Sequence, residues 1–238
     1  MEAQRQDLIQ LAAALRKGTQ AGTGNLEKPQ GRETAFTDGF IAGLKKELEP
    51  KANCINYNFK VNVVKSDAEG AIGSDLTISW NREGQAYCLY LQVKYLYRDY
   101  NHYANSTQTG SKELKEYWKG CAPWFNAAYM SKAKDTMGTY QALAMQDFVN
   151  TDLKATPPCI SKAVFFLFGD KDSGNTSPCI VDVQTIAAKC GAENPRALKR
   201  EHLMDLTPQQ LQAIYEAKVP ILKNLFSAND PLLDFLRA

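Results

Sequence analysis

Several kinds of site need residues that this chain has in short supply. Only two of its 238 residues are histidine, and its six cysteines include no C-x-x-C pair. Zinc sites are usually built from closely spaced Cys and His ligands, so the sequence argues against one. Several cysteines stand in apolar runs such as "AYCLYL" and "SPCIVDV". We expect them to be reduced, structural thiols in a cytosolic protein.

Long apolar segments and an excess of charge are also missing. No run of eighteen apolar residues occurs, so we expect no membrane span. The first residues lack the basic-then-apolar order of a signal peptide, and we expect a cytoplasmic protein. The 28 Lys and Arg nearly balance the 26 Asp and Glu. Such a balance neither requires nor excludes a nucleic-acid partner, because a local basic surface matters more than the total.

The chain is long enough to bury a sizeable core, since 44% of its residues are hydrophobic. Apolar spacing predicts a short amphipathic helix at the start. A Gly- and Thr-rich linker is expected over residues 18–31, and a second helix is expected from residue 32 until Pro50 closes it. We therefore divide the chain into an N-terminal helix and linker, residues 1–31, and a single domain, residues 32–238.

The rest of the chain mixes strand-like and helix-like segments. Alternating apolar residues predict a strand over residues 54–65 and a hairpin over residues 75–96, and an apolar run predicts a buried strand over residues 162–170. Helical spacing predicts a helix over residues 136–153. Thr207 followed by Pro208 is typical of a helix start and opens a set of short C-terminal helices. This order favours an α/β fold: a central mixed β-sheet flanked by helices, with a C-terminal helical extension.

The hairpin carries polar residues where apolar packing is expected. Gln92 and Lys94 are two residues apart in a strand, so they point to the same face. Asp75 heads the preceding strand, and the turn at Arg82–Gly84 would bring it toward them. An acid, an amide carbonyl and an ammonium would then converge. The alternative places Gln92 and Lys94 in solvent, although "YCLYLQVKYLY" is too apolar for a strand with one wet face.

Such a convergence fits metal-assisted hydrolysis of phosphodiesters. Oxygen ligands suit Mg²⁺ or Mn²⁺, with water and phosphate completing the shell. A nearby lysine could orient or activate the attacking water and stabilise the charge that develops on the phosphate.

Asp75 followed by Gln92-Val93-Lys94 on the next strand resembles the signature of the restriction-endonuclease-like superfamily, PD-(D/E)xK, in the variant where Gln replaces the usual Asp or Glu. An uncharacterised microbial family of that fold is similar in a wider pattern: Glu33-Thr-Ala-Phe-Thr-Asp38, Glu69-x-x-x-Gly73-Ser-Asp75, Gln92-x-Lys94 and Gln141. The resemblance covers roughly residues 32–170. It implies a restriction-endonuclease-like core and a Mg²⁺- or Mn²⁺-dependent endonuclease acting on DNA or RNA. A neutral Gln would hold metal more weakly than an acid.

Some candidate site residues have a plainer alternative. In the superfamily an acidic residue on the preceding helix often completes the site. Glu33 fits that role, but the helix dipole alone also favours a Glu in the first turn. Glu69 would be a further metal ligand beside glycines that let the backbone approach a phosphate, or else an ordinary loop acid. Gln141 would touch the substrate backbone or Lys94, or else be a partly exposed helix residue.

The polar segment after the signature strand offers further contacts to nucleic acid. Arg98 and Tyr100 could pair with phosphates and stack on bases, and Lys112 belongs to a basic stretch that could line a groove. A solvated loop is the plainer interpretation. We carry three hypotheses: a metal-dependent nuclease, a catalytically inactive nucleic-acid-binding or protein-interaction module of the same fold, and an unrelated α/β interaction or immunity-type domain. A homodimer is left open.

Overall fold

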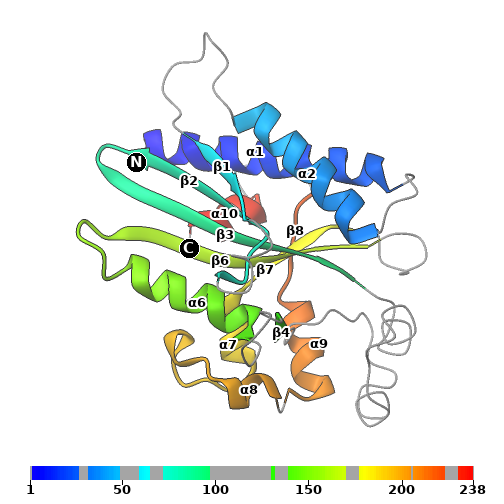
Figure 1. Ribbon diagram of the computed structural model, residues 1–238, viewed down its shortest axis with the longest axis vertical. Helices are drawn as coiled ribbons and strands as arrows, with labels where there is room; N and C mark the ends of the chain where they lie inside the picture. Colours follow the sequence, from blue (N-terminus) through cyan, green and yellow to red (C-terminus); the bar gives the residue numbers. More distant parts are fainter. Residues whose placement is uncertain are drawn as a thin grey trace.

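The computed structural model describes residues 2–26, 32–48, 59–64, 72–96, 130–131, 139–169, 177–204, 206–222 and 230–237. Its centre is a six-stranded mixed sheet with the strand order β1-β2-β3-β6-β7-β8. Helices flank both faces of this sheet (Figure 1). The expected α/β class, a central mixed sheet between helices, is therefore confirmed.

The sheet combines an antiparallel meander with one parallel neighbour. Its strands are β1 (Lys60–Val63), β2 (Leu76–Arg82), β3 (Gln85–Tyr95), β6 (Cys159–Phe168), β7 (Cys179–Asp182) and β8 (Val219–Pro220). Strands β1, β2 and β3 are antiparallel, and β6 runs parallel to β3. A parallel pair needs a crossover connection, and helix α6 (Gln141–Asp152) lies in the segment that makes it. The pair β4 (Met130–Ser131) and β5 (Thr139–Tyr140) forms a separate small sheet.

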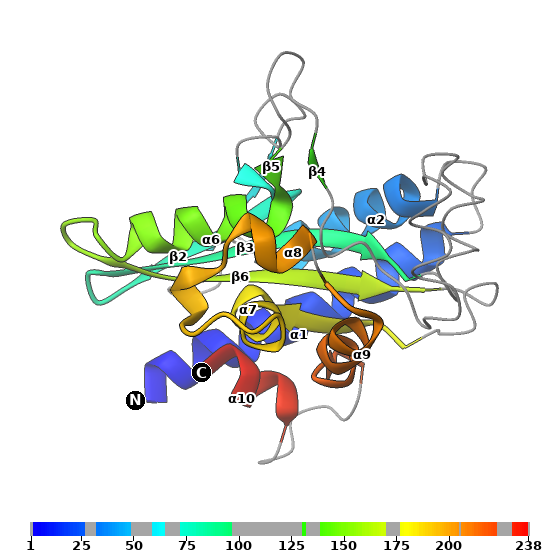
Figure 2. The ribbon, with the colours of Figure 1, turned by 90° about the horizontal axis from the view of Figure 1, so that it is seen from below.

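Two groups of helices enclose the sheet (Figures 1 and 2). One face is covered by α1 (Glu2–Asn25) and α2 (Arg32–Leu48), with α10 (Pro231–Arg237) beside α1. The other is covered by α6, α7 (Val183–Lys189), the 3₁₀ turn η1 (Pro195–Ala197), α8 (Arg200–Met204) and α9 (Pro208–Glu216). The alternation of β3 explains the division, because Leu91 and Val93 pack toward α1 and α2 while Tyr90 and Leu96 pack toward α6.

The expected linker over residues 18–31 is wrong in its first part, because α1 continues through residue 25. Two of the glycines in this part, Gly18 and Gly22, lie where α1 crosses α2. A Cβ on Gly18 would lie 2.9 Å from the Phe40 ring, and one on Gly22 would lie 2.9 Å from the Phe36 ring. A Cβ on Gly43 would lie 2.8 Å from the Cα of Gly18. Glycines four residues apart fall on one face of each helix, so they serve close helix packing rather than a loop.

A buried ion pair ties α1 to the C-terminal segment. The Nη2 of Arg16 lies 2.6 Å from the Oδ2 of Asp230, and its Nε donates to the carbonyl of Ile221 at 2.9 Å. Both charged side chains are almost fully shielded from solvent. The first helix therefore shares one core with β8 and α10.

Cys88, Cys159, Cys179 and Cys190 are free thiols, as expected, whereas Cys54 and Cys121 lie outside the described residues. None of the helices within the described ranges is long and apolar enough to cross a membrane.

Candidate active site

The predicted site lies in the second half of β3, inside the sheet. Leu76 pairs with Leu91, so Asp75, the residue before β2, stands opposite Gln92. The Asp75 backbone N–H donates to the Leu91 carbonyl at 3.0 Å, which extends the ladder to this position. Gln92 and Lys94 share the face that α6 covers, because Tyr90 and Leu96 alternate with them on that side. The prediction that both residues point to one side of a central strand, with Asp75 at its antiparallel neighbour, is confirmed.

Hydrogen bonds from β3 fix the Asp75 carboxylate. Its Oδ2 accepts from the Nε2 of Gln92 at 2.9 Å and from the backbone N–H of Val93 at 2.7 Å. Bonds to an ionised acceptor are stronger than neutral ones. The carboxylate is therefore held against the strand that carries Gln92 and Lys94.

Two buried polar atoms beside Asp75 have no hydrogen-bond partner within the described part of the chain. One is the Oε1 of Gln92, a residue that is only 1% exposed. The other is the hydroxyl of Ser74, which is fully buried. Leaving such an atom without a partner costs about 1–3 kcal/mol. Each of these two atoms, one next to Asp75 in the sequence and one on the side chain that bonds to it, therefore calls for an explanation.

Lys94 lies inside the molecule beside an acid from α2. It is 9% exposed, and its Nζ lies 3.5 Å from the Oε1 of Glu33. The alternative with Gln92 and Lys94 on a wet strand face is therefore wrong. Glu33 stands in the first turn of α2, and 45% of its side chain is exposed. Glu33, the acid expected to complete the site, thus forms an ion pair with Lys94.

The start of α6 closes the site next to Asp75. Gln141, its first residue, is fully buried, so the interpretation as a partly exposed helix residue is wrong. Gly73 has φ +74°, and a Cβ on it would lie 2.5 Å from the Gln141 carbonyl oxygen. Glycine meets both conditions, the positive φ and the close approach. This contact sets the Gly73–Asp75 segment against the first turn of α6.

Cys88 and Tyr90 precede Gln92 on the same face of β3 but do not supply a nucleophile. Burial, helped by nearby Asp152, raises the pKa of the Cys88 thiol to about 12. Burial also raises the pKa of Tyr90, whose hydroxyl donates to Asp152 at 3.0 Å. Both groups stay protonated at neutral pH. Neither residue is therefore a candidate nucleophile, and the other polar side chains on this part of β3 are Gln92 and Lys94, beside Asp75.

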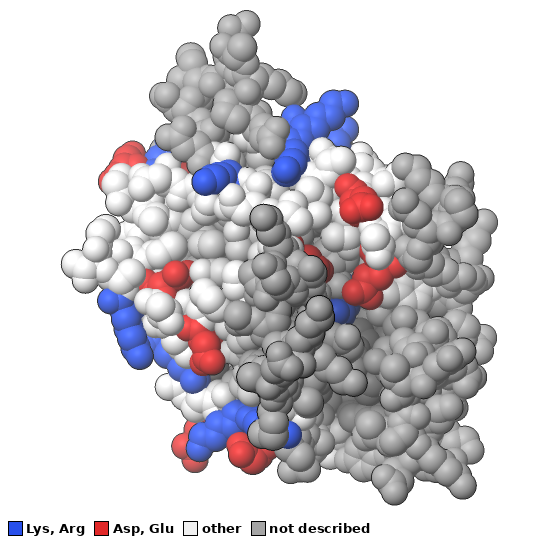
Figure 3. All heavy atoms as spheres, viewed as in Figure 1, with Lys and Arg blue, Asp and Glu red and all other residues white. Residues whose placement is uncertain are grey.

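Four predicted site residues, Glu69, Arg98, Tyr100 and Lys112, lie outside the described residues. Within the described ranges no three His, Cys, Asp or Glu side chains form a group suited to a metal ion. The oxygens that the structure brings to β3 are instead one carboxylate and one amide, with Glu33 across Lys94. Basic and acidic side chains are interspersed over the described part of the face in Figure 3, without a continuous basic surface there.

Sequence reasoning missed Ser74. Its only signal was its place next to Asp75 in "GSD", because hydroxyls are common in turns and burial cannot be read from one residue. Comparison with known proteins adds no assignment, since no protein-family model matches the chain and no curated protein matches its sequence.

Proposed function

We propose that the protein is a metal-dependent nuclease that hydrolyses phosphodiester bonds in DNA or RNA and has the restriction-endonuclease-like fold. The observation that carries the proposal is the bonded pair Asp75–Gln92 beside the buried Lys94, together with a Gln92 Oε1 to which no described residue donates. Lysine is almost never fully buried unless it is paired, and Lys94 is paired with Glu33. The mixed sheet flanked by helices is compatible with the core that the sequence resemblance implies.

Mg²⁺ or Mn²⁺ fits the donor atoms of this site. The buried carbonyl oxygen of Gln92 needs a positive partner, and the Asp75 carboxylate supplies negative charge. These two residues would hold the ion, with Glu33 and Glu69 as further candidate ligands. The bound ion would polarise a phosphate oxygen and lower the pKa of a bound water. One carboxylate with a neutral amide binds cations less strongly than two carboxylates, so we expect weak metal binding.

Side chains of the protein would stabilise the developing charge and orient the carboxylate. The Lys94 ammonium would stabilise the negative charge that develops on the phosphate, and Glu33, 3.5 Å away, would position it. The Gln92 Nε2 and the Val93 N–H hold the Asp75 carboxylate in one orientation. Such preorganisation avoids reorganisation during the reaction.

Cleavage of DNA and RNA by the purified protein tests the proposal. We expect nicking or degradation with Mg²⁺ or Mn²⁺ that stops when a chelator is added. Asp75→Ala and Lys94→Ala should each slow cleavage roughly a hundredfold, equivalent to about 3 kcal/mol. Lys154→Ala, at an exposed lysine just after α6, is the matched control and should keep full activity. If the first two variants cleave as fast as wild type, the site is wrong.

A catalytically inactive binding module of the same fold is the second candidate. It is favoured by the way the polar groups of the site bond to one another, the Gln92 amide to the Asp75 carboxylate and Lys94 to Glu33. Gln92→Glu separates the two candidates because it restores the common acid. A module is indicated if wild type cleaves no DNA or RNA while Gln92→Glu gains cleavage. A nuclease is indicated if wild type cleaves and Gln92→Glu binds Mn²⁺ more tightly in calorimetry.

A further inference from the structure

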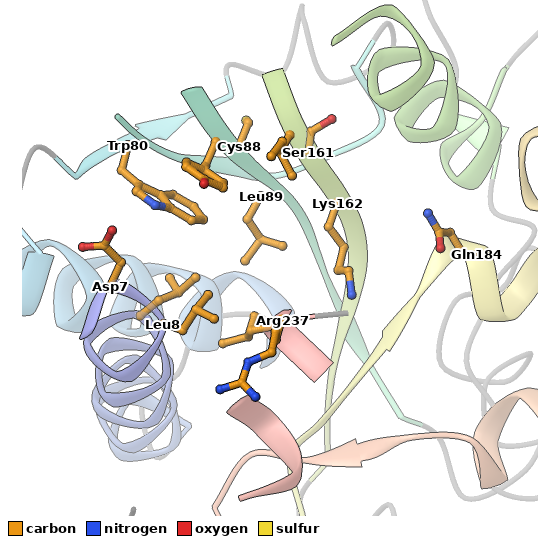
Figure 4. Close-up of a pocket in the computed structure, with 13 residues that line it drawn as sticks. Asp7, Leu8, Trp80, Cys88, Leu89, Ser161, Lys162, Gln184 and Arg237 are labelled. Carbon is orange, nitrogen blue, oxygen red and sulfur yellow. The ribbon is translucent and has the colours of Figure 1, made fainter. Parts of the chain in front are cut away.

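A cavity lies on the sheet face opposite Gln92, near the half of β3 closer to its turn (Figure 4). Its volume is about 130 Å³. Its apolar walls come from α1, the hairpin and α10, and are formed by Leu8, Leu11, Trp80, Tyr87, Leu89 and Leu236. Because the cavity faces away from the candidate active site, a ligand could bind in the cavity without contacting that site.

The size of the cavity sets the size of its occupant. Protein interiors are close-packed, with few voids larger than a water molecule. A cavity of about 150 Å³ in another protein binds benzene. The rings of Trp80 and Tyr87 stack on one another with centroids 5.2 Å apart and form a flat wall. This space suits one six-membered ring or a short branched hydrocarbon.

Charge at the cavity favours an anion. The lining holds one carboxylate, Asp7, and two cations, Lys162 and Arg237. Arg82 already binds Asp7 through two hydrogen bonds of 2.6 and 2.9 Å, which neutralises the carboxylate. The two cations come from different elements, β6 and α10, and an anion would contact both only after the exposed Arg237 side chain, which Figure 4 shows turned away from Lys162, rotates toward it.

Lys162 in particular gains from an anionic neighbour. Its Nζ donates to the Phe235 carbonyl at 2.7 Å, and its nearest carboxylate is the Oδ2 of Asp182 at 3.8 Å. Burial lowers the pKa of Lys162, since desolvation disfavours the charged ammonium, while Asp182 opposes this shift. A carboxylate in the cavity would add to the stabilisation that Asp182 gives.

We propose that this cavity binds a small monocarboxylate with one aromatic ring or a branched hydrocarbon chain. The hydrocarbon occupies the space beside Trp80 and Leu89, and the carboxylate faces Lys162 and Arg237. The proposal is independent of the nuclease activity, because none of these residues belongs to the candidate active site.

Titration of the full chain with benzoate and with neutral benzyl alcohol tests the proposal by calorimetry and tryptophan fluorescence. We expect benzoate to bind with a Kd on the order of 1 mM, which nine heavy atoms can supply. Benzyl alcohol should bind about threefold or more weakly. Arg237→Gln changes an exposed residue and should remove much of this difference, since an exposed ion pair is worth up to about fivefold. It should leave benzyl alcohol binding unchanged.

Leu236→Trp, which fills the cavity from α10, should abolish binding of both probes. The melting temperature of Leu236→Trp is measured to confirm that this variant folds. If Leu236→Trp does not fold, the result for Arg237→Gln still decides the test. The proposal is overturned if neither probe binds at roughly 20 mM, well above the expected Kd. Equal binding of both probes, insensitive to Arg237→Gln, also overturns it.

Discussion

The two faces of the sheet solve the problem of burial in different ways. Toward α1 and α2 the core consists of aromatic rings and close backbone contacts. Phe36 stacks on Phe168 with ring centroids 3.8 Å apart, and Gly18 lies against Gly43. Toward α6, strand β3 buries Gln92 and Lys94, and no donor to the Gln92 Oε1 is found within the described part of the chain. The two faces therefore differ in the polar groups that they bury: an ion pair, Arg16–Asp230, lies on the first, and an amide and an ammonium from one strand lie on the second.

Breaking the ion pair between Arg16 of α1 and Asp230 should cause the largest loss of stability. Asp230→Ala leaves the Arg16 guanidinium buried without its carboxylate, and we expect the free energy of unfolding to fall by about 3–5 kcal/mol in urea denaturation. Asp234→Ala, at an exposed acid on α10, is the control and should change it by about 0.5 kcal/mol or less. Similar losses for the two variants would show that α10 is not anchored through Arg16.

Replacing glycines of α1 by alanine should have the next largest effect on stability. The effect should have opposite signs at two nearby positions. Gly22→Ala places a methyl group 2.9 Å from the Phe36 ring and carbonyl, and should cost about 1–3 kcal/mol. Gly24→Ala meets no atom within 4 Å and should stabilise the helix by up to about 1 kcal/mol. Thermal unfolding of both variants checks this. A stabilising Gly22→Ala would mean that the helices are not closely packed there.

The hairpin could be predicted from the sequence because its signals are local. Alternating apolar residues define each strand. The turn residues Glu83 and Gly84 adopt φ +51° and +81° and thereby set the register. Once the register is fixed, Asp75 must stand opposite Gln92. The same logic predicts which face carries Lys94, but it cannot say what covers that face.

The features that could not be predicted from the sequence depend on contacts between segments that are distant in the chain. The composition of residues 18–25 is that of a linker, and only the opposing α2 shows that Gly18 and Gly22 are packing positions. The partner of Glu33 likewise follows from how α2 meets the sheet, which its own sequence does not encode. The Ser74 hydroxyl is notable only because nothing described lies within bonding distance.

Thiols distinguish the faces as well, because Cys179 and Cys190 belong to the core on the α6 side. Burial raises the pKa of Cys179 from 9.0 to about 12. A pKa raised by folding gives stability that is complete below pH 9 and is lost as the pH rises toward the folded value. At pH 10 this thiol alone should lower the free energy of unfolding by about 1.4 kcal/mol relative to pH 7.

Urea denaturation of wild type and Cys179→Ala between pH 7 and pH 11 measures this contribution. The variant loses some packing at every pH, but its stability should fall less steeply above pH 9. Parallel curves for the two proteins would show that Cys179 does not experience the burial seen on this face.

Gln92→Leu gives the smallest expected change in stability and the sharpest view of the contrast. The substitution removes the hydrogen bond to Asp75, worth about 1 kcal/mol, but also removes a buried oxygen that costs about 1–3 kcal/mol. We expect the free energy of unfolding to stay level or rise by about 1 kcal/mol. Gln210→Leu is the control, because the Gln210 Oε1 accepts from the Thr207 N–H in a capping box and its loss should cost about 1 kcal/mol. If Gln92→Leu instead loses more than about 2 kcal/mol, the oxygen is not a liability, Gln92 is a structural residue, and the two faces do not differ in the way that the site requires.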